Sequence, residues 1–142
     1  MKFVLDTCII SEAVRPRPDP AVLAWLAAQD ESDLLLCSLT LGELGKGIER
    51  LRRGSKRSGL ENWLLDLERR FGSRILPIDA RVALHWGHLD ALLASKGKAL
   101  PVVDGLIASC AIDNGAVLAT RNIKDFVETG VELFNPWDLG KK

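Results

Sequence analysis

The stretch Lys2-Phe3-Val4-Leu5-Asp6-Thr7-Cys8 places a short apolar segment directly before an acidic residue. The run Lys2–Leu5 is typical of a buried strand, which Asp6 then ends. Four further apolar runs along the chain are interpreted as strands: Leu34–Cys37, Ile75–Ile78, Ala116–Ala119 and Val131–Phe134. Because helical patterns separate these runs, the sequence predicts an α/β fold with a mostly parallel sheet and helices on both faces.

Amphipathic spacing and capping residues define the helices between these strands. They are predicted at Ile9–Val14, Asp19–Gln29, Thr40–Arg53, Leu60–Phe71, Asp79–Gly97 and Val102–Asp113, with a helical turn at Ile123–Val127. Gly54–Gly59 is predicted to be a polar, basic linker. Gly72 is predicted to end the helix Leu60–Phe71. We expect one domain over residues 1–138 and a disordered tail at 139–142.

Composition excludes several classes of protein. Lys+Arg and Asp+Glu both number 19, so bulk charge does not predict a nucleic-acid partner. Residues 46–57 nevertheless carry basic side chains against Glu49 alone, which is either a solvated face or a means of steering an anionic ligand. The three cysteines form no CxxC pair, so neither a disulfide framework nor a zinc knuckle is indicated. With no signal peptide and no long apolar run, we expect a reduced, cytoplasmic protein with no membrane partner.

Three acidic residues stand where ligands bind in an open α/β sheet, beyond the carboxyl ends of the strands. Asp6 follows the first strand, Glu43 lies one turn into the helix after the second, and Asp104 opens a later helix. Gathered carboxylates repel each other and need a cation nearby. Oxygen ligands with no histidine or cysteine among them suit Mg²⁺ or Mn²⁺ rather than zinc. A metal ion held in this way supports phosphodiester hydrolysis, because it polarises phosphate and lowers the pKa of bound water.

Two of these acids also have a purely structural interpretation. Thr40-Leu41-Gly42-Glu43 matches a capping box, in which the side chain of Glu43 would close back on Thr40. Asp104 in a first helical turn would complement the helix dipole. Asp6 is harder to explain in this way, because an acid directly after a buried strand must find partners within the fold. The acids together therefore carry more weight than any one of them.

Four motifs, in order along nearly the whole chain, resemble those of PIN-domain ribonucleases, specifically the VapC/FitB toxins of type II toxin–antitoxin pairs. They are Val4-Leu5-Asp6-Thr7 with Ile10-Ser11-Glu12, Ser38-Leu39-Thr40-Leu41-Gly42-Glu43-Leu44, Asp104-Gly105-Leu106-Ile107-Ala108, and Leu118-Ala119-Thr120-Arg121-Asn122-Ile123-Lys124-Asp125-Phe126. Phe134-Asn135-Pro136-Trp137 resembles the ending of FitB-like chains. The resemblance implies a three-layer PIN-like fold, with a mostly parallel sheet of about five short strands flanked by helices.

The resemblance also implies a function: the toxin of a toxin–antitoxin system, an endoribonuclease that uses Mg²⁺ or Mn²⁺ to hydrolyse RNA. It implies a homodimer, and a cognate VapB/FitA-like antitoxin with which the toxin can form a larger assembly. By position, the metal-binding and catalytic acids are Asp6, Glu43 and Asp104. Candidates for the pocket or the outer shell of the metal are Thr7, Thr120, Asn122 and Asp125.

Two positions depart from the family pattern. Cys8 stands where the family usually has asparagine, and Asn122 stands where many relatives have a fourth acid, which Asp125 is a candidate to replace. Two alternative functions stay open: a PIN-type RNA-processing nuclease without an antitoxin, and a catalytically weak, metal-assisted RNA-binding module. A phosphorylated receiver-like domain is disfavoured, because Leu34–Ser38 offers no aspartate to accept the phosphoryl group.

Overall fold

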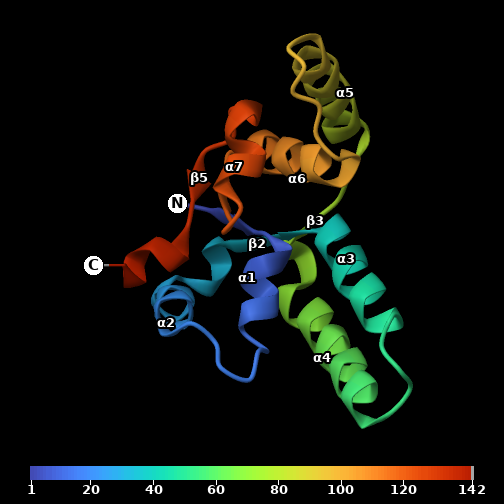
Figure 1. Cartoon of the computed structure of the whole chain (residues 1–142), viewed down its shortest axis with the longest axis vertical. Helices are drawn as coiled ribbons and strands as arrows, with labels where there is room; N and C mark the ends of the chain where they lie inside the picture. Colours follow the sequence, from blue (N-terminus) through green and yellow to red (C-terminus); the bar gives the residue numbers. More distant parts are fainter. Residues whose placement is uncertain (142) are drawn as a thin grey trace.

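The computed structural model describes residues 1–141, and one five-stranded sheet forms its centre, in the order β3-β2-β1-β4-β5 (Figure 1). The strands are β1 (Phe3–Leu5), β2 (Leu34–Cys37), β3 (Ile75–Leu76), β4 (Val117–Ala119) and β5 (Leu133–Phe134). Every neighbouring pair in the sheet is parallel. The structure therefore confirms the predicted α/β fold with a parallel sheet.

Helices cover both faces of the sheet and make it the middle of three layers. One side carries α1 (Thr7–Glu12), α2 (Pro20–Ala28) and α4 (Ser55–Phe71), and the other α5 (Ala80–Ser95), α6 (Val102–Asp113) and α7 (Ile123–Phe126). Successive residues of a strand face opposite sides. Phe3 and Leu5 accordingly pack in the first core, and Val4 in the second. α3 (Ser38–Glu49) contributes to both, with Leu44 in the first and Leu39 against the second.

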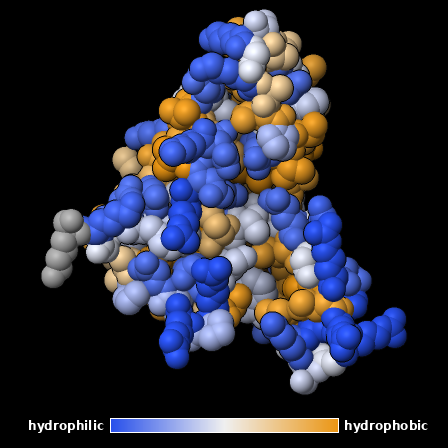
Figure 2. Space-filling view, in the orientation of Figure 1, coloured by the Kyte–Doolittle hydropathy of each residue, from blue (hydrophilic) through white to orange (hydrophobic). Residues whose placement is uncertain are grey.

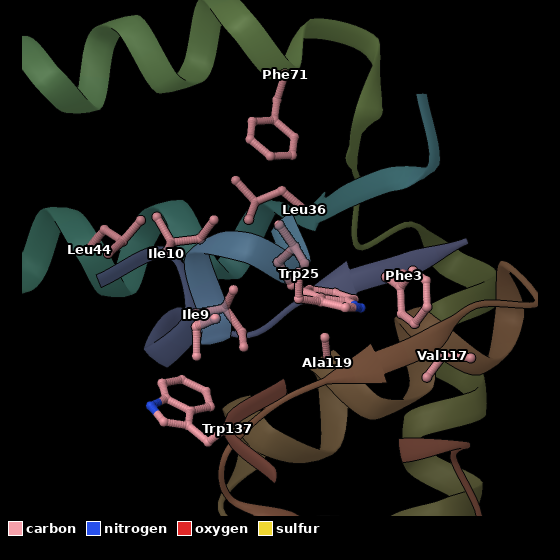
Figure 3. Close-up of a cluster of buried hydrophobic side chains, with 12 residues drawn as sticks. Phe3, Ile9, Ile10, Trp25, Leu36, Leu44, Phe71, Val117, Ala119 and Trp137 are labelled. Atoms are coloured by element: carbon pink, nitrogen blue, oxygen red, sulfur yellow. The ribbon is translucent and has the colours of Figure 1, made fainter. Parts of the chain in front are cut away.

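Aromatic side chains fill the core between the sheet and α1, α2 and α4 (Figure 3). The rings of Phe3 and Trp25 meet edge to face, with centroids 5.0 Å apart, and Phe134 packs against both. Trp137 closes the same cluster from the short 3₁₀ helix η4 (Pro136–Gly140). These aromatic residues are therefore part of the core.

The region around α3 and α4 differs most from the prediction. α3 begins directly after β2 with Cys37 as its N-cap and ends at Glu49, whereas we predicted Thr40–Arg53. The predicted linker at Gly54–Gly59 is wrong, because α4 already begins at Ser55. Arg57 gives the physical reason: its guanidinium donates to the Leu51 carbonyl and to the Glu49 carboxylate, which ties the first turn of α4 to the end of α3.

Other boundaries lie close to those predicted. Asp19 and Asp79 cap α2 and α5 through their carboxylates, and Gly72 ends α4 with a left-handed φ of 52°. The helix η4 reaches Gly140 and so includes part of the expected tail at 139–142, of which Lys142 lies outside the described residues. The remaining 3₁₀ turns are η1 (Glu31–Asp33), η2 (Gly72–Arg74) and η3 (Val127–Thr129). Among residues 1–141, no helix has the length and apolar character needed to cross a membrane.

Candidate active site

The candidate site lies at the carboxyl edge of the sheet, where β1 and β4 are neighbours. The chain passes from β1 to β2 on one side and later crosses to β4 on the other, so the strand order reverses here. A crevice at such a reversal is the usual ligand site of an open parallel sheet. Asp6 and Thr120 follow the two strands, and the Asp6 amide donates to the Ala119 carbonyl over 3.0 Å.

Both carboxylate oxygens of Asp6 accept hydrogen bonds, although the residue is only 6% exposed. Oδ1 accepts from the Thr7 amide at 2.9 Å, which caps α1, and Oδ2 accepts from the Thr120 hydroxyl at 2.8 Å. Thr120 is fully buried, and its hydroxyl in turn accepts from the Asn122 amide at 3.0 Å. The Asn122 amide therefore directs the Thr120 hydrogen toward Asp6, and Asp6 is held in one orientation.

Glu43 is directed toward α1 and not toward the start of its own helix. The Thr7 hydroxyl donates to Glu43 Oε1 over 2.8 Å. Cys37, rather than Thr40, is the N-cap of α3, and no side chain caps that end. The Thr40 hydroxyl is buried and has no hydrogen-bond partner within residues 1–141. The capping box is therefore not formed, and the structural interpretation of Glu43 is wrong.

Asp104 lies in the first turn of α6, within electrostatic range of the other acids. Burial raises the pKa of its carboxyl group above the ordinary value, and the charges of Asp6, Glu43 and Asp125 raise it further. None of these four carboxylates forms an ion pair within residues 1–141. The fold thus brings the predicted acids within electrostatic range of one another, with no cation from the chain to balance them.

Asp6, Glu43 and Asp104 nevertheless do not form a complete coordination shell for a metal ion. No group of three or more histidine, cysteine, aspartate or glutamate side chains in residues 1–141 is close enough to hold a metal ion directly. Mutual repulsion separates carboxylates that share a crevice. Mg²⁺ commonly keeps several water ligands and binds through one or two carboxylates, so such spacing is compatible with its coordination.

Cys8, which departs from the family pattern, lies beside Asp6 and Thr120. Its sulfur lies 3.9 Å from Asp6 Oδ2 and 3.7 Å from the Thr120 hydroxyl, and it accepts a hydrogen bond from the Arg121 amide at 3.4 Å. Burial raises the pKa of the thiol, and the charge of Asp6 adds to this, against the opposing effect of the Arg121 amide. Cys8 therefore acts as a neutral packing residue beside Asp6.

The family model described as "PIN domain" matches residues 3–131. The chain belongs to the PIN-domain family. Two curated relatives cover almost its full length. "VapC ribonuclease Y4jK" of Sinorhizobium fredii is 35% identical over 96% of this chain and 98% of its own, and "Toxin FitB" of Neisseria gonorrhoeae is 36% identical over 95% and 98%. Within the PIN-domain family, the chain thus groups with VapC and FitB proteins, as its motifs indicate.

A solved structure supports the same placement of this PIN domain. It is titled "Crystal Structure of FitAcB from Neisseria gonorrhoeae", has 35% sequence identity and a TM-score of 0.90, and covers 95% of this chain and 98% of the other. Agreement over nearly the whole of both chains confirms the PIN-like fold.

Asn122 and Asp125 border the acids of the PIN domain from the segment after β4. The Asn122 main chain contributes the hydrogen bond to Thr120, and its carbonyl accepts from the Asp125 amide at 3.1 Å. The Asp125 carboxylate is close enough to raise the pKa of Asp104. The Asn122 main chain is thus joined to Thr120, and the Asp125 carboxylate lies within electrostatic range of Asp104.

One contact behind Asp104 was not predicted. A Cβ atom on Gly105 would lie 2.9 Å from Cδ1 of the Trp86 indole, so only glycine allows α5 and α6 to approach in this way. The apolar periodicity places Trp86 on the inward face of α5 but does not identify its neighbour. A glycine directly after an acid in a helix is the signal that could have revealed it.

Proposed function

We propose that this PIN domain is a metal-dependent endoribonuclease and the toxin of a type II toxin–antitoxin pair. The observation that carries the proposal is the convergence of Asp6, Glu43 and Asp104 from three elements at one crevice, without a compensating cation from residues 1–141. Two relatives that match 96% and 95% of this chain, one named a ribonuclease and the other a toxin, support it.

The donor set fits Mg²⁺ or Mn²⁺, because it consists of carboxylate oxygens with hydroxyl groups behind them. Asp6, Glu43 and Asp104 would hold the ion, one or two of them directly and the rest through its water ligands, and the bound ion would polarise the scissile phosphate and lower the pKa of attacking water. Thr120 and Thr7 orient Asp6 and Glu43 through their hydroxyl groups. Asp125 contributes negative charge beside Asp104 and would act on bound water rather than on the ion.

A groove that begins at the acids is our candidate for the antitoxin site. It has a volume of about 310 Å³ between α1, α3 and α4, is open to Thr7 and Glu43 at one end, and is lined by Leu44, Leu60 and Trp63. A second hollow of about 440 Å³ continues along α3 and α4, with Glu49, Glu61 and Glu68 at its rim. This combination suits an apolar peptide segment that places a basic side chain near the acids.

A homodimer is the oligomeric state that we propose. Leu84 and Leu92 lie two turns apart on α5 and are 77% and 46% exposed. Two large apolar side chains on one helix face favour contact with another protein surface. A second copy of the chain is the partner that the family resemblance implies.

Inducible expression in a bacterium tests the proposed function as a whole. The wild type should arrest growth and degrade RNA, Asp6→Asn should do neither, and a cognate antitoxin should restore growth. RNA cleavage by the purified protein without growth arrest, and without an antitoxin in its complexes from native cells, would favour an RNA-processing nuclease. RNA binding without cleavage at any metal concentration would favour the binding module.

A further inference from the structure

Five cationic side chains surround the turn between α3 and α4, and we call them the basic turn. All five are exposed, and none forms an ion pair within residues 1–141. Hydrophilic side chains project at the end of the molecule where α3 and α4 meet (Figure 2). The basic turn consists of Lys46, Arg50, Arg52, Arg53 and Lys56.

The acids nearest to the basic turn already have a partner. Arg57, which is only 16% exposed, binds the Glu49 carboxylate at 2.7 Å and lies 3.5 Å from that of Glu61. Its guanidinium also donates to main-chain carbonyls at the end of α3. Arg57 therefore stabilises the turn and pairs with the carboxylates of Glu49 and Glu61. In the part of the chain that the structure describes, the five cations of the basic turn have no such partner.

The basic turn is continuous with the candidate active site along α3. Lys46 and Arg50 follow Glu43 by three and seven residues, which places all three on one face of the helix. At 1.5 Å per residue, Arg50 lies about 10 Å from Glu43 along the helix axis. A single-stranded RNA with one phosphate at Glu43 would therefore have its next phosphates beside Lys46 and Arg50.

We infer that the basic turn binds the phosphate backbone of the RNA substrate on one side of the cleavage point. This inference rests on the proposed function. An acidic crevice repels a polyanion, so binding needs cations beside the crevice, and exposed Lys and Arg supply this sequence-independent attraction. An acidic protein is a weaker candidate, because Glu68 lines the adjoining hollow, forms no ion pair within residues 1–141, and would repel it.

RNA binding at several salt concentrations tests the inference. The parent is Asp6→Asn, which keeps the RNA intact, and the probe is a labelled single-stranded RNA followed by fluorescence anisotropy. Two double variants, Lys46→Gln with Arg50→Gln and Arg52→Gln with Arg53→Gln, remove cations from the basic turn. Lys2→Gln with Lys96→Gln removes the same charge from two exposed positions outside it, before β1 and at the end of α5.

Each lost phosphate contact should reduce the slope of log K against log salt concentration by about 0.7. A basic-turn double variant should therefore flatten the slope by up to about 1.4 and weaken binding most at low salt, while the control variant keeps the parent slope. Parent slopes in both basic-turn variants would overturn the inference. It would also fail if these variants weakened only the complex with antitoxin or with DNA.

The result also separates this inference from the proposed function. If the wild type cleaves RNA with Mg²⁺ but the basic-turn variants keep the parent slope, only the inference fails. If the wild type neither binds nor cleaves RNA, the proposed function fails and the inference fails with it.

Discussion

The Thr7 hydroxyl donates a 2.8 Å hydrogen bond to Glu43 Oε1 and so joins the first residue of α1 to the middle of α3. The Thr7 main-chain amide also donates a hydrogen bond to Asp6 Oδ1, which makes Asp6 the N-cap of α1. One residue therefore fixes two of the three acids relative to each other. Hydroxyl and amide donors hold Asp6 and Glu43 in place, and no cationic side chain of residues 1–141 pairs with either carboxylate.

Glu43→Gln should abolish RNA cleavage and leave the free energy of unfolding within about 0.5 kcal/mol of the wild type. The amide can still accept the Thr7 hydrogen bond, so what is lost is the charge. Cleavage assays paired with urea unfolding measure both effects. Glu132→Gln, an exposed position at the opposite edge of the sheet, is the matched control. Normal cleavage by Glu43→Gln would remove this residue from the site.

Thr120→Val should weaken metal affinity or activity by roughly 10–100-fold, as loss of a partner behind a metal ligand typically does. It should also cost about 1–3 kcal/mol in stability, because Asp6 and the Asn122 amide lose a buried partner. Thr120→Ser keeps the hydroxyl and should recover most of the activity. Isothermal titration with Mn²⁺ measures the metal affinity directly. Wild-type metal affinity and activity in Thr120→Val would show that the hydroxyl has no part in the site.

Asp125→Asn should reduce activity by roughly 10–100-fold, well short of the loss from Asp6→Asn, if Asp125 acts through bound water. Asn122→Asp should hold or raise activity, because it restores a fourth acid to the pocket. Cleavage rates across a Mg²⁺ titration distinguish the two effects. Wild-type behaviour of Asp125→Asn at every Mg²⁺ concentration would mean that Asp125 has no part in the site.

Asp104 should make the metal-free protein less stable as the pH rises. Its pKa in the folded state is raised above the ordinary value of 3.8, first by burial and then by Asp6, Glu43 and Asp125. Between the ordinary and the raised pKa, the folded state holds more protons than the unfolded chain, so stability falls with increasing pH. Asp104→Asn should remove this dependence and be the more stable protein at neutral pH. Urea unfolding of both proteins in EDTA over a pH series measures the difference, which should vanish below pH 3.8. Parallel curves at all pH values would contradict it.

The strands and the acids could be predicted from local sequence because each has a local signal. Leu34–Cys37 is a buried apolar run and Asp6 ends another, so periodicity and strand ends identify them. The start of α4 could not be predicted, because it depends on contacts of Arg57 with the end of α3. Thr120 could be predicted as a candidate for the pocket, but its hydrogen bond to Asp6 could not, since that depends on pairing between strands more than a hundred residues apart in the chain.

The central claim is that three acids from different elements form one divalent-metal site that cleaves RNA. Its most direct test is RNA cleavage by the purified protein with Mg²⁺ or Mn²⁺, then with excess EDTA, then with metal restored. The account predicts cleavage that EDTA abolishes and added metal recovers, and no cleavage by Asp6→Asn or Asp104→Asn under any of the three conditions. Full cleavage in excess EDTA, or by either variant, would contradict it.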